Sequence, residues 1–310
     1  MTVDAEAVAA SPAPPRGSPD PHAAMPVTGR FAGHLHFDGS IAPVLHTEVD
    51  VAAYVRRGTA RLPVDTAQVE AEGPLGDEVR LTLGVLQRLE GSSLTESRAM
   101  LSTATGNEAR ITAFLATWQV DRFWQSRALR DLLTGDHPTA RPHPRHRPTP
   151  GQTLRRIHVD RVQPLLSPLW TGLAGESAAA GHMARMAIQE GSLRTALLLL
   201  ADRLVGEARR VVLEVAERHE VAVDFFTAEA RERILRSRRE AVTARLLLAL
   251  GSPLEGGGVP DPDLRAALAV LGATAADRAA LRRARYEITR LLPGPAPRDP
   301  HLSSLPRHGE

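Results

Sequence analysis

The sequence predicts an all-α protein built around four long amphipathic helices. From about residue 76, apolar residues recur in four long segments with the 3.6-residue period of an α-helix. A linker rich in Pro, His and Arg, residues 135–151, separates the first two segments from the last two and is expected to be an exposed crossover loop. With 43% apolar but only 4% aromatic residues, the chain can bury a sizeable core made mainly of Leu, Val and Ala.

Two parts of the chain precede the helices. Residues 1–30 are rich in Ala, Pro, Gly and Ser and are expected to form a disordered tail. This tail lacks the apolar stretch of a signal peptide. Residues 31–75 form an N-terminal extension in which short β-like fragments are expected.

The helices themselves follow in order along the chain. The four long ones are expected at 77–105, 107–133, 173–205 and 207–235, with a shorter helix at 153–166 before the third. A further segment at 237–250 completes a bundle domain that spans 76–251. A C-terminal helical segment, 252–294, adds two shorter helices at 261–271 and 274–292, and residues 295–310 form a second disordered tail.

The composition excludes several kinds of chemistry. The chain has no cysteine, which rules out disulfides, thiolate metal sites and a Cys nucleophile and fits a cytoplasmic protein. All 38 basic residues are arginine, so neither a Schiff-base lysine nor a phosphate-loop lysine is present. The net charge is only +2, with arginines scattered among 36 acids, and this balance does not indicate a nucleic-acid partner. The apolar runs are too short to span a membrane.

Each of the four long helices carries one acid in the middle of its apolar face. These acids are Glu90, Asp121, Glu190 and Glu220. A buried carboxylate without a partner is costly, so a cluster of four requires bound cations, buried arginines or shared protons. Two divalent metal ions would neutralise four carboxylates, as in di-iron and di-manganese four-helix bundles.

If no metal is bound, arginines near the same faces are the expected counter-charges. Arg122 on the second helix and Arg185 on the third are the candidates, with Gln125 as a neutral neighbour. The acids would then be structural, or they would serve acid–base chemistry at a raised pKa. The sequence leaves these alternatives open.

Several segments resemble one family in both order and spacing. The stretches 105–118 (TGNEARITAFLATW), 182–190 (HMARMAIQE) and 220–226 (EVAVDFF) are similar to the second, third and fourth helices of actinobacterial ferritin-like proteins. The segments 253–260 and 291–294 resemble the tail of those proteins, so the resemblance spans about 80–294. It implies a ferritin-like four-helix bundle, with O₂ or peroxide chemistry on a small organic substrate.

The chain departs from this family at the expected metal ligands. Ferritin-like di-iron sites place a histidine three residues after the acid of the second and fourth helices, where this chain has Trp124 and Val223. The remaining nitrogen donors near the faces are His182 and His219, which would otherwise be hydrogen-bonded interface residues. The resemblance thus implies a degenerate site, rich in oxygen ligands, for Fe or Mn.

Three functions from different classes remain at this point. One is an oxidoreductase or oxygenase that uses a metal held by Glu90, Asp121, Glu190 and Glu220 on a small organic molecule. The second is a metal-free relative of the same bundle that serves as a binding, scaffold or partner subunit. A cofactor-free acid–base enzyme is the third. Each is compatible with a homo-oligomer, whereas the long tails do not suit an iron-storage shell.

Overall fold

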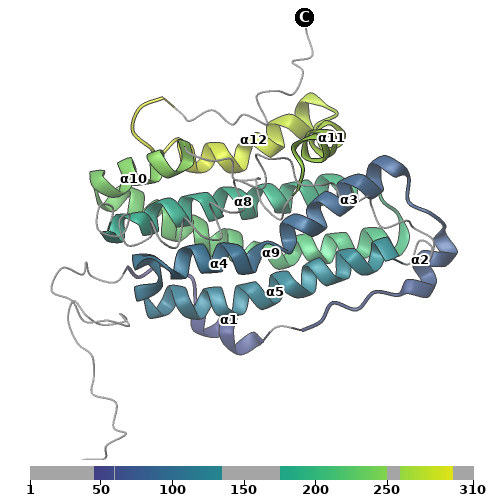
Figure 1. Cartoon of the computed structure of the whole chain (residues 1–310), viewed down its shortest axis with the longest axis horizontal. Coiled ribbons are helices and arrows are strands. Elements are labelled where there is room, and N and C mark those ends of the chain that lie inside the picture. The colour runs from purple at the N-terminus through teal and green to yellow at the C-terminus, as the bar shows by residue number, and fades with distance from the viewer. Residues whose placement is uncertain (1–44, 59, 135–174, 250–258, 296–310) are drawn as a thin grey trace, which may run out of the picture.

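The computed structural model describes residues 45–58, 60–134, 175–249 and 259–295 (Figure 1). Every regular element in these ranges is a helix, and they contain no strand, which confirms the all-α prediction. The predicted tail 1–30, the crossover loop 135–151, the short helix 153–166 and almost all of the C-terminal tail lie outside the described residues.

Four helices pack side by side in a closed ring. They are α3 (Asp77–Glu90), α5 (Ala109–Thr134), α8 (Ala178–Ala201) and α9 (Gly206–Arg236). Around the ring, α3 contacts α5, α5 contacts α9, α9 contacts α8, and α8 contacts α3. The predicted second and fourth helices agree with α5 and α9 to within two residues at each end.

The first long helix is broken, which the sequence analysis did not predict. After α3 ends at Glu90, the chain turns through Gly91 and Ser92 and continues as α4 (Ser93–Leu101), followed by the 3₁₀ turn η2 (Ala104–Asn107). The Ser92 hydroxyl donates to the Leu89 carbonyl at 2.6 Å. The Leu89 carbonyl also accepts from the Ser92 backbone N–H at 3.2 Å, three residues on and not four, so the regular α-helical ladder ends here and another donor can reach this carbonyl.

The N-terminal extension forms two short helices where β-like fragments were expected. They are α1 (Val51–Arg57) and α2 (Thr66–Glu72), and the side chains of Asp50 and Asp65 cap their N-termini. Because aspartate side chains accept from free amide groups at helix starts, these caps favour helix over strand. The prediction of β-like fragments is thus wrong for the described part of 31–75.

Reciprocal capping ties α2 to α9. The Glu72 carboxylate accepts from the Glu207 backbone N–H at 3.0 and 3.1 Å, at the start of α9. In return, the Glu207 carboxylate accepts from the backbone N–H of Asp65 at 2.9 Å. Gly206, the first residue of α9, has a φ of 57° and comes close to the Glu72 carboxylate.

A second layer of helices covers one side of the ring, as Figure 1 shows. α10 (Arg238–Ala249) and α12 (Ala275–Thr289) pack on α8, and α11 (Asp261–Leu271) packs on α3. α8 is therefore enclosed from two sides. Small residues permit this close packing, because a Cβ at Gly181 would overlap Leu247 of α10 and one at Gly191 would lie 2.9 Å from the Ala284 Cβ of α12.

The buried core falls into two apolar clusters. One is rich in Leu and Val and includes Leu83, Leu129, Leu197 and Val212. The other holds the aromatic and Met side chains, among them Phe114, Trp118, Met183, Met186, Phe225 and Phe226. Along α5, α8 and α9 the two clusters occupy opposite halves of each helix, so the middle of the ring separates them.

Candidate functional site

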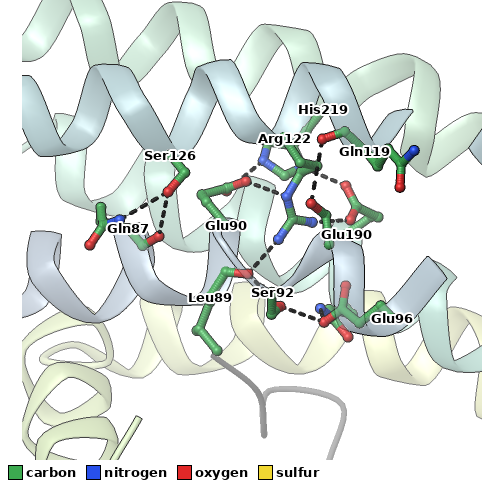
Figure 2. A network of polar contacts seen from close by, with 12 residues as sticks. Gln87, Leu89, Glu90, Ser92, Glu96, Gln119, Arg122, Ser126, Glu190 and His219 are labelled. Atoms are coloured by element: carbon green, nitrogen blue, oxygen red, sulfur yellow. Dashed lines mark hydrogen bonds and ion pairs between the residues drawn. The ribbon is translucent and has the colours of Figure 1, made fainter. Parts of the chain in front are cut away.

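Four charged side chains fill the middle of the ring, between the two apolar clusters. Glu90, Arg122, Glu190 and His219 come from α3, α5, α8 and α9, one from each helix (Figure 2). Each is at most 1% exposed. We call this group the ionic quartet.

Within the quartet, acids and bases alternate. His219 bridges the two carboxylates, with its Nδ1 2.6 Å from Glu190 Oε2 and its Nε2 2.8 Å from Glu90 Oε1. Arg122 bridges them a second time, through Nε to Glu90 Oε2 and through Nη1 to Glu190 Oε1. All four carboxylate oxygens thus have a cationic partner, and the contacts form a closed ring.

The break after Glu90 supplies the remaining partner of the guanidinium. Arg122 Nη2 donates to the Leu89 carbonyl at 2.7 Å. This carbonyl is the one that the turn at Gly91 and Ser92 leaves outside a regular helical ladder. The interruption of the first helix therefore belongs to the site, because it lets Arg122 bind the backbone of α3 as well as the two acids.

The charges in the quartet balance. Burial alone would lower the pKa of His219, but Glu90 and Glu190 outweigh it and raise that pKa to about 9. Burial alone would raise the pKa of Glu190, but Arg122 and His219 hold it below its ordinary value. Since Arg122 is always charged, two cationic side chains face the carboxylates of Glu90 and Glu190.

These residues do not fit a metal ion. When both His219 nitrogens donate to carboxylates, the imidazolium has no lone pair for a metal. The carboxylate oxygens already accept from His219 and Arg122, and the guanidinium lies between the two acids. In the described ranges of the chain, no group of three or more His, Asp or Glu side chains is arranged to hold a metal ion.

Two of the four predicted carboxylates lie at the site, and two do not. Glu90 and Glu190 are buried in the quartet, as predicted. Asp121 instead points toward α1, where it accepts a hydrogen bond from the Tyr54 hydroxyl. Glu220 has a side chain 60% exposed and lies 3.9 Å from Arg194 on the surface, so its prediction as an inward ligand is wrong.

The error has one physical cause in both helices. The inward face of α5 is centred on Arg122 and that of α9 on His219, in each case one residue away from the predicted acid. One residue corresponds to about 100° around a helix, which is enough to turn a central side chain to the edge or the surface. In α9 the run Val211, Val212, Val215 and Ala216 leads directly to His219, and this signal was available in the sequence.

The histidines and arginines also have defined positions. Arg122 is the predicted counter-charge, whereas Arg185 is only half-buried and lies outside the quartet. His182 does not contact the quartet, since its Nδ1 pairs with the Thr105 hydroxyl at 2.8 Å. Burial, with a smaller effect of Arg185, lowers the pKa of His182 to about 4. Gln125, the predicted neutral neighbour, is buried on α5.

The structure also contains a second buried ionic cluster, which the sequence did not predict. Arg233 and Glu229 of α9 are fully buried. Arg233 Nη2 lies 2.7 Å from both carboxylate oxygens of Glu108, and 3.1 Å from Glu229. Glu229 also pairs with Arg110, which donates to the Val49 carbonyl at 2.8 Å. This cluster fastens the segment before α1 to α5 and α9.

No family model, no curated protein and no solved structure matches the chain significantly. Among the described residues, no helix is both long enough and apolar enough to cross a membrane.

Proposed function

We propose that this chain is a ferritin-like helical protein that has a permanent ionic quartet in place of a metal centre. It acts as a binding or scaffold protein, or as a partner subunit, and not as an oxidoreductase. The single observation that carries the proposal is the position of Arg122, which pairs with Glu90 and Glu190 at the centre of the ring.

The arrangement of the residues that point to the centre of the ring supports the proposed resemblance to ferritin-like bundles. In di-iron and di-manganese bundles, two helices each give one Glu and the other two each give a Glu-x-x-His pair, all pointing to the centre. Here each of four ring helices also sends one charged side chain to the centre, with Glu on α3 and α8. Arg122 and His219 stand at the positions of the other two acids, followed three residues later by Gln125 and Ala222.

The charge balance supports the proposal that the site binds no metal ion. Two divalent ions offset four carboxylates in a di-metal site, whereas one arginine and one imidazolium offset the two carboxylates of this chain. An added divalent ion would have to displace a buried guanidinium, which would then lose both ionic partners at a large energetic cost. The quartet is thus complete without a cation, and redox chemistry at this position has no support from its donor atoms.

Because the centre of the ring is filled, we propose that other molecules bind to the outer surface of the helices. The quartet and the second ionic cluster hold the helices in one arrangement, since each residue needs partners from other helices. Buried ionic groups of this kind contribute to structural specificity in some proteins, and we propose that role here. A rigid helical body with a fixed outer face suits a binding or scaffold role.

Elemental analysis tests the proposal. The protein is purified from cells supplied with Fe and Mn, and metal per chain is measured for the wild type and for Glu190→Ala. We expect less than about one-tenth of a metal ion per chain in both, because the quartet already satisfies its charges. About one metal ion or more in the wild type, lost in Glu190→Ala, would sink the proposal, and metal retained in both would contradict its metal-free part.

A further inference from the structure

The outer face of α4 and α5 carries a group of exposed apolar side chains. These are Leu94 and Leu101 on α4 and Val120 and Phe123 on α5, which we call the α4–α5 patch. Phe123 is 53% exposed and Leu94 is 50% exposed. Large apolar side chains scattered singly need no explanation, but a contiguous group indicates a contact surface.

The four side chains border the same seam between two helices. α4 and α5 lie side by side in Figure 1, and the Ser93 hydroxyl contacts the Gln119 carbonyl at 3.5 Å. Leu94 directly follows Ser93, and Phe123 lies one turn after Gln119, so both are close to this contact. Phe123 also packs edge-on against Trp124, with ring centroids 5.0 Å apart, which restrains the exposed ring.

The shape of the patch suits a third helix. Leu94 and Leu101 are seven residues apart on α4, and Val120 and Phe123 are three apart on α5, so each pair lies along one face of its own helix. An amphipathic helix presents apolar residues at the same spacings, and such helices commonly bind in a groove between two others. Apolar side chains placed along two adjacent helices suit an elongated helical partner better than a flat membrane surface.

The charges around the patch are basic. Arg98 on α4 and Arg127 and Arg130 on α5 are exposed beside it. Of the acids on the same helices, Glu96 pairs with Ser92 and Gln189, whereas Asp131 lies 3.6 Å from Arg127 and 3.5 Å from Arg61 and offsets part of the charge of Arg127. A second copy docked by two-fold symmetry would bring these arginines toward one another, whereas an acidic partner would complement them.

From this combination we infer that the α4–α5 patch docks an acidic amphipathic helix of a protein partner. The inference rests on the binding role proposed above and gives it a surface and a partner chemistry. Leucines and other apolar residues of the partner helix would cover Leu94, Leu101, Val120 and Phe123. Its flanking Asp and Glu side chains would face Arg98, Arg127 and Arg130.

The test uses three synthetic helical peptides with identical leucine positions whose polar positions are acidic, neutral or basic. Binding of each to the full chain is measured by fluorescence anisotropy. We expect the acidic peptide to bind most tightly and to lose affinity with added salt. Phe123→Ser should weaken it by about tenfold, since a central aromatic side chain carries much of the affinity in such interfaces. Arg98→Glu should weaken it by about fivefold.

The control is Leu246→Ser on α10, a site 59% exposed and outside the patch, which should leave binding unchanged. Three results would overturn the inference. The Phe123→Ser variant could bind the acidic peptide as tightly as the wild type does, the chain could prefer the neutral or basic peptide, or no peptide could bind. The inference would also be wrong if the wild type sedimented as a dimer and Phe123→Ser as a monomer, since the patch would then bind a second copy. It would be wrong as well if the wild type floated with phosphatidylserine vesicles and Phe123→Ser did not, since the patch would then bind a membrane. Metal analysis of the same samples tests the metal-free proposal separately, so the two failures are distinguishable.

Discussion

Arg122 of α5 and Glu190 of α8 form an ion pair across the middle of the ring, and both side chains are shielded from solvent. The pair lies where the Leu-rich cluster meets the aromatic cluster, so buried charge separates the two apolar clusters. Such a pair contributes little net stability compared with apolar residues of the same volume, but its disruption is expensive.

Replacing Arg122 by Met should destabilise the fold by about 3–5 kcal/mol, because Glu90 and Glu190 would share a single cationic partner in a buried site. The free energy of unfolding is measured by urea titration. Adding Glu190→Gln to Arg122→Met should recover part of the loss, because it leaves one anion and one cation. Arg127→Met is the control on the same helix, where an exposed pair should cost no more than about 1 kcal/mol. A cost for Arg122→Met as small as that of the control would refute a closed quartet.

The pKa of His219 predicts how stability depends on pH. Its pKa rises from an ordinary value of 6.5 to about 9 in the folded protein, so the folded state holds the proton more tightly. This contribution is complete below 6.5 and is lost as the pH rises toward 9, by a total of about 3 kcal/mol. Unfolding of the wild type and of His219→Gln at pH 6 to 10 should show this loss in the wild type alone. An NMR titration that places the pKa of His219 below 7 would contradict it.

His182 should respond to pH with the opposite sign. Its pKa falls to about 4 in the folded protein, because burial disfavours the charged imidazole. The unfolded chain therefore binds the proton more readily between about 4 and 6.5, and stability falls as the solution is acidified through that range. His182→Gln can keep a hydrogen bond to Thr105 while removing the titration, so its stability should vary less at acidic pH. Equal acid sensitivity in wild type and variant would show that other groups dominate.

Gly206 should be the least replaceable glycine described. Its φ of 57° strains any other residue, and a Cβ there would overlap the Glu72 carboxylate that caps α9. Gly206→Ala should lower the midpoint of thermal unfolding through a loss of about 1–3 kcal/mol. Gly84→Ala is the matched control, since Gly84 lies inside α3 with nothing within 4 Å of an added Cβ. That variant should gain about 0.5–1 kcal/mol from the higher helix propensity of alanine. If both variants lost stability equally, the clash at Glu72 would not be its cause.

Much of the fold could be predicted from periodicity, but the register of two helices could not. α5, α9 and α11 were predicted to within two residues at each end, because their apolar residues recur with the period of an α-helix. The broken first helix was missed, since Gly91 and Ser92 are compatible with a continuous helix, and the contacts at the turn come from α5, where Ser126 lies beside Gly91 and Arg122 donates to the Leu89 carbonyl.

The site was predicted in part, for a physical reason. On α3 and α8 the acid was the only charge on an apolar stripe, so Glu90 and Glu190 were identified. On α5 and α9 two charged residues stand side by side, Asp121 with Arg122 and His219 with Glu220. Periodicity alone cannot decide which of two neighbours lies at the centre, because packing against the other helices fixes the rotation of each helix. A bias toward acids as metal ligands favoured the wrong neighbour in both.

Metal binding in redesigned variants would test which residues of α5 and α9 occupy the central positions. If the quartet occupies the positions of a ferritin-like di-metal site, the missing ligands can be restored there. The required changes are Arg122→Glu with Gln125→His on α5, and His219→Glu with Ala222→His on α9. All four positions are buried, so the new side chains would point to the centre. Four acids and two histidines would then converge, as in di-iron bundles.

We expect the restored variant to bind about two Fe or Mn ions per chain, as di-metal bundles do. It should also unfold at a higher temperature with metal than without it, because bound metal stabilises the folded state and four unneutralised acids destabilise it.

The control carries the same motif one residue out of register, through Asp121→Glu with Trp124→His and Val223→His beside the native Glu220. Since Glu220 is exposed and Asp121 faces Tyr54, this control should bind no more metal than the wild type. Circular dichroism checks that both variants remain helical. Metal binding by the control but not by the restored variant would show that Arg122 and His219 do not occupy ligand positions, and the ferritin-like interpretation of the quartet would be wrong.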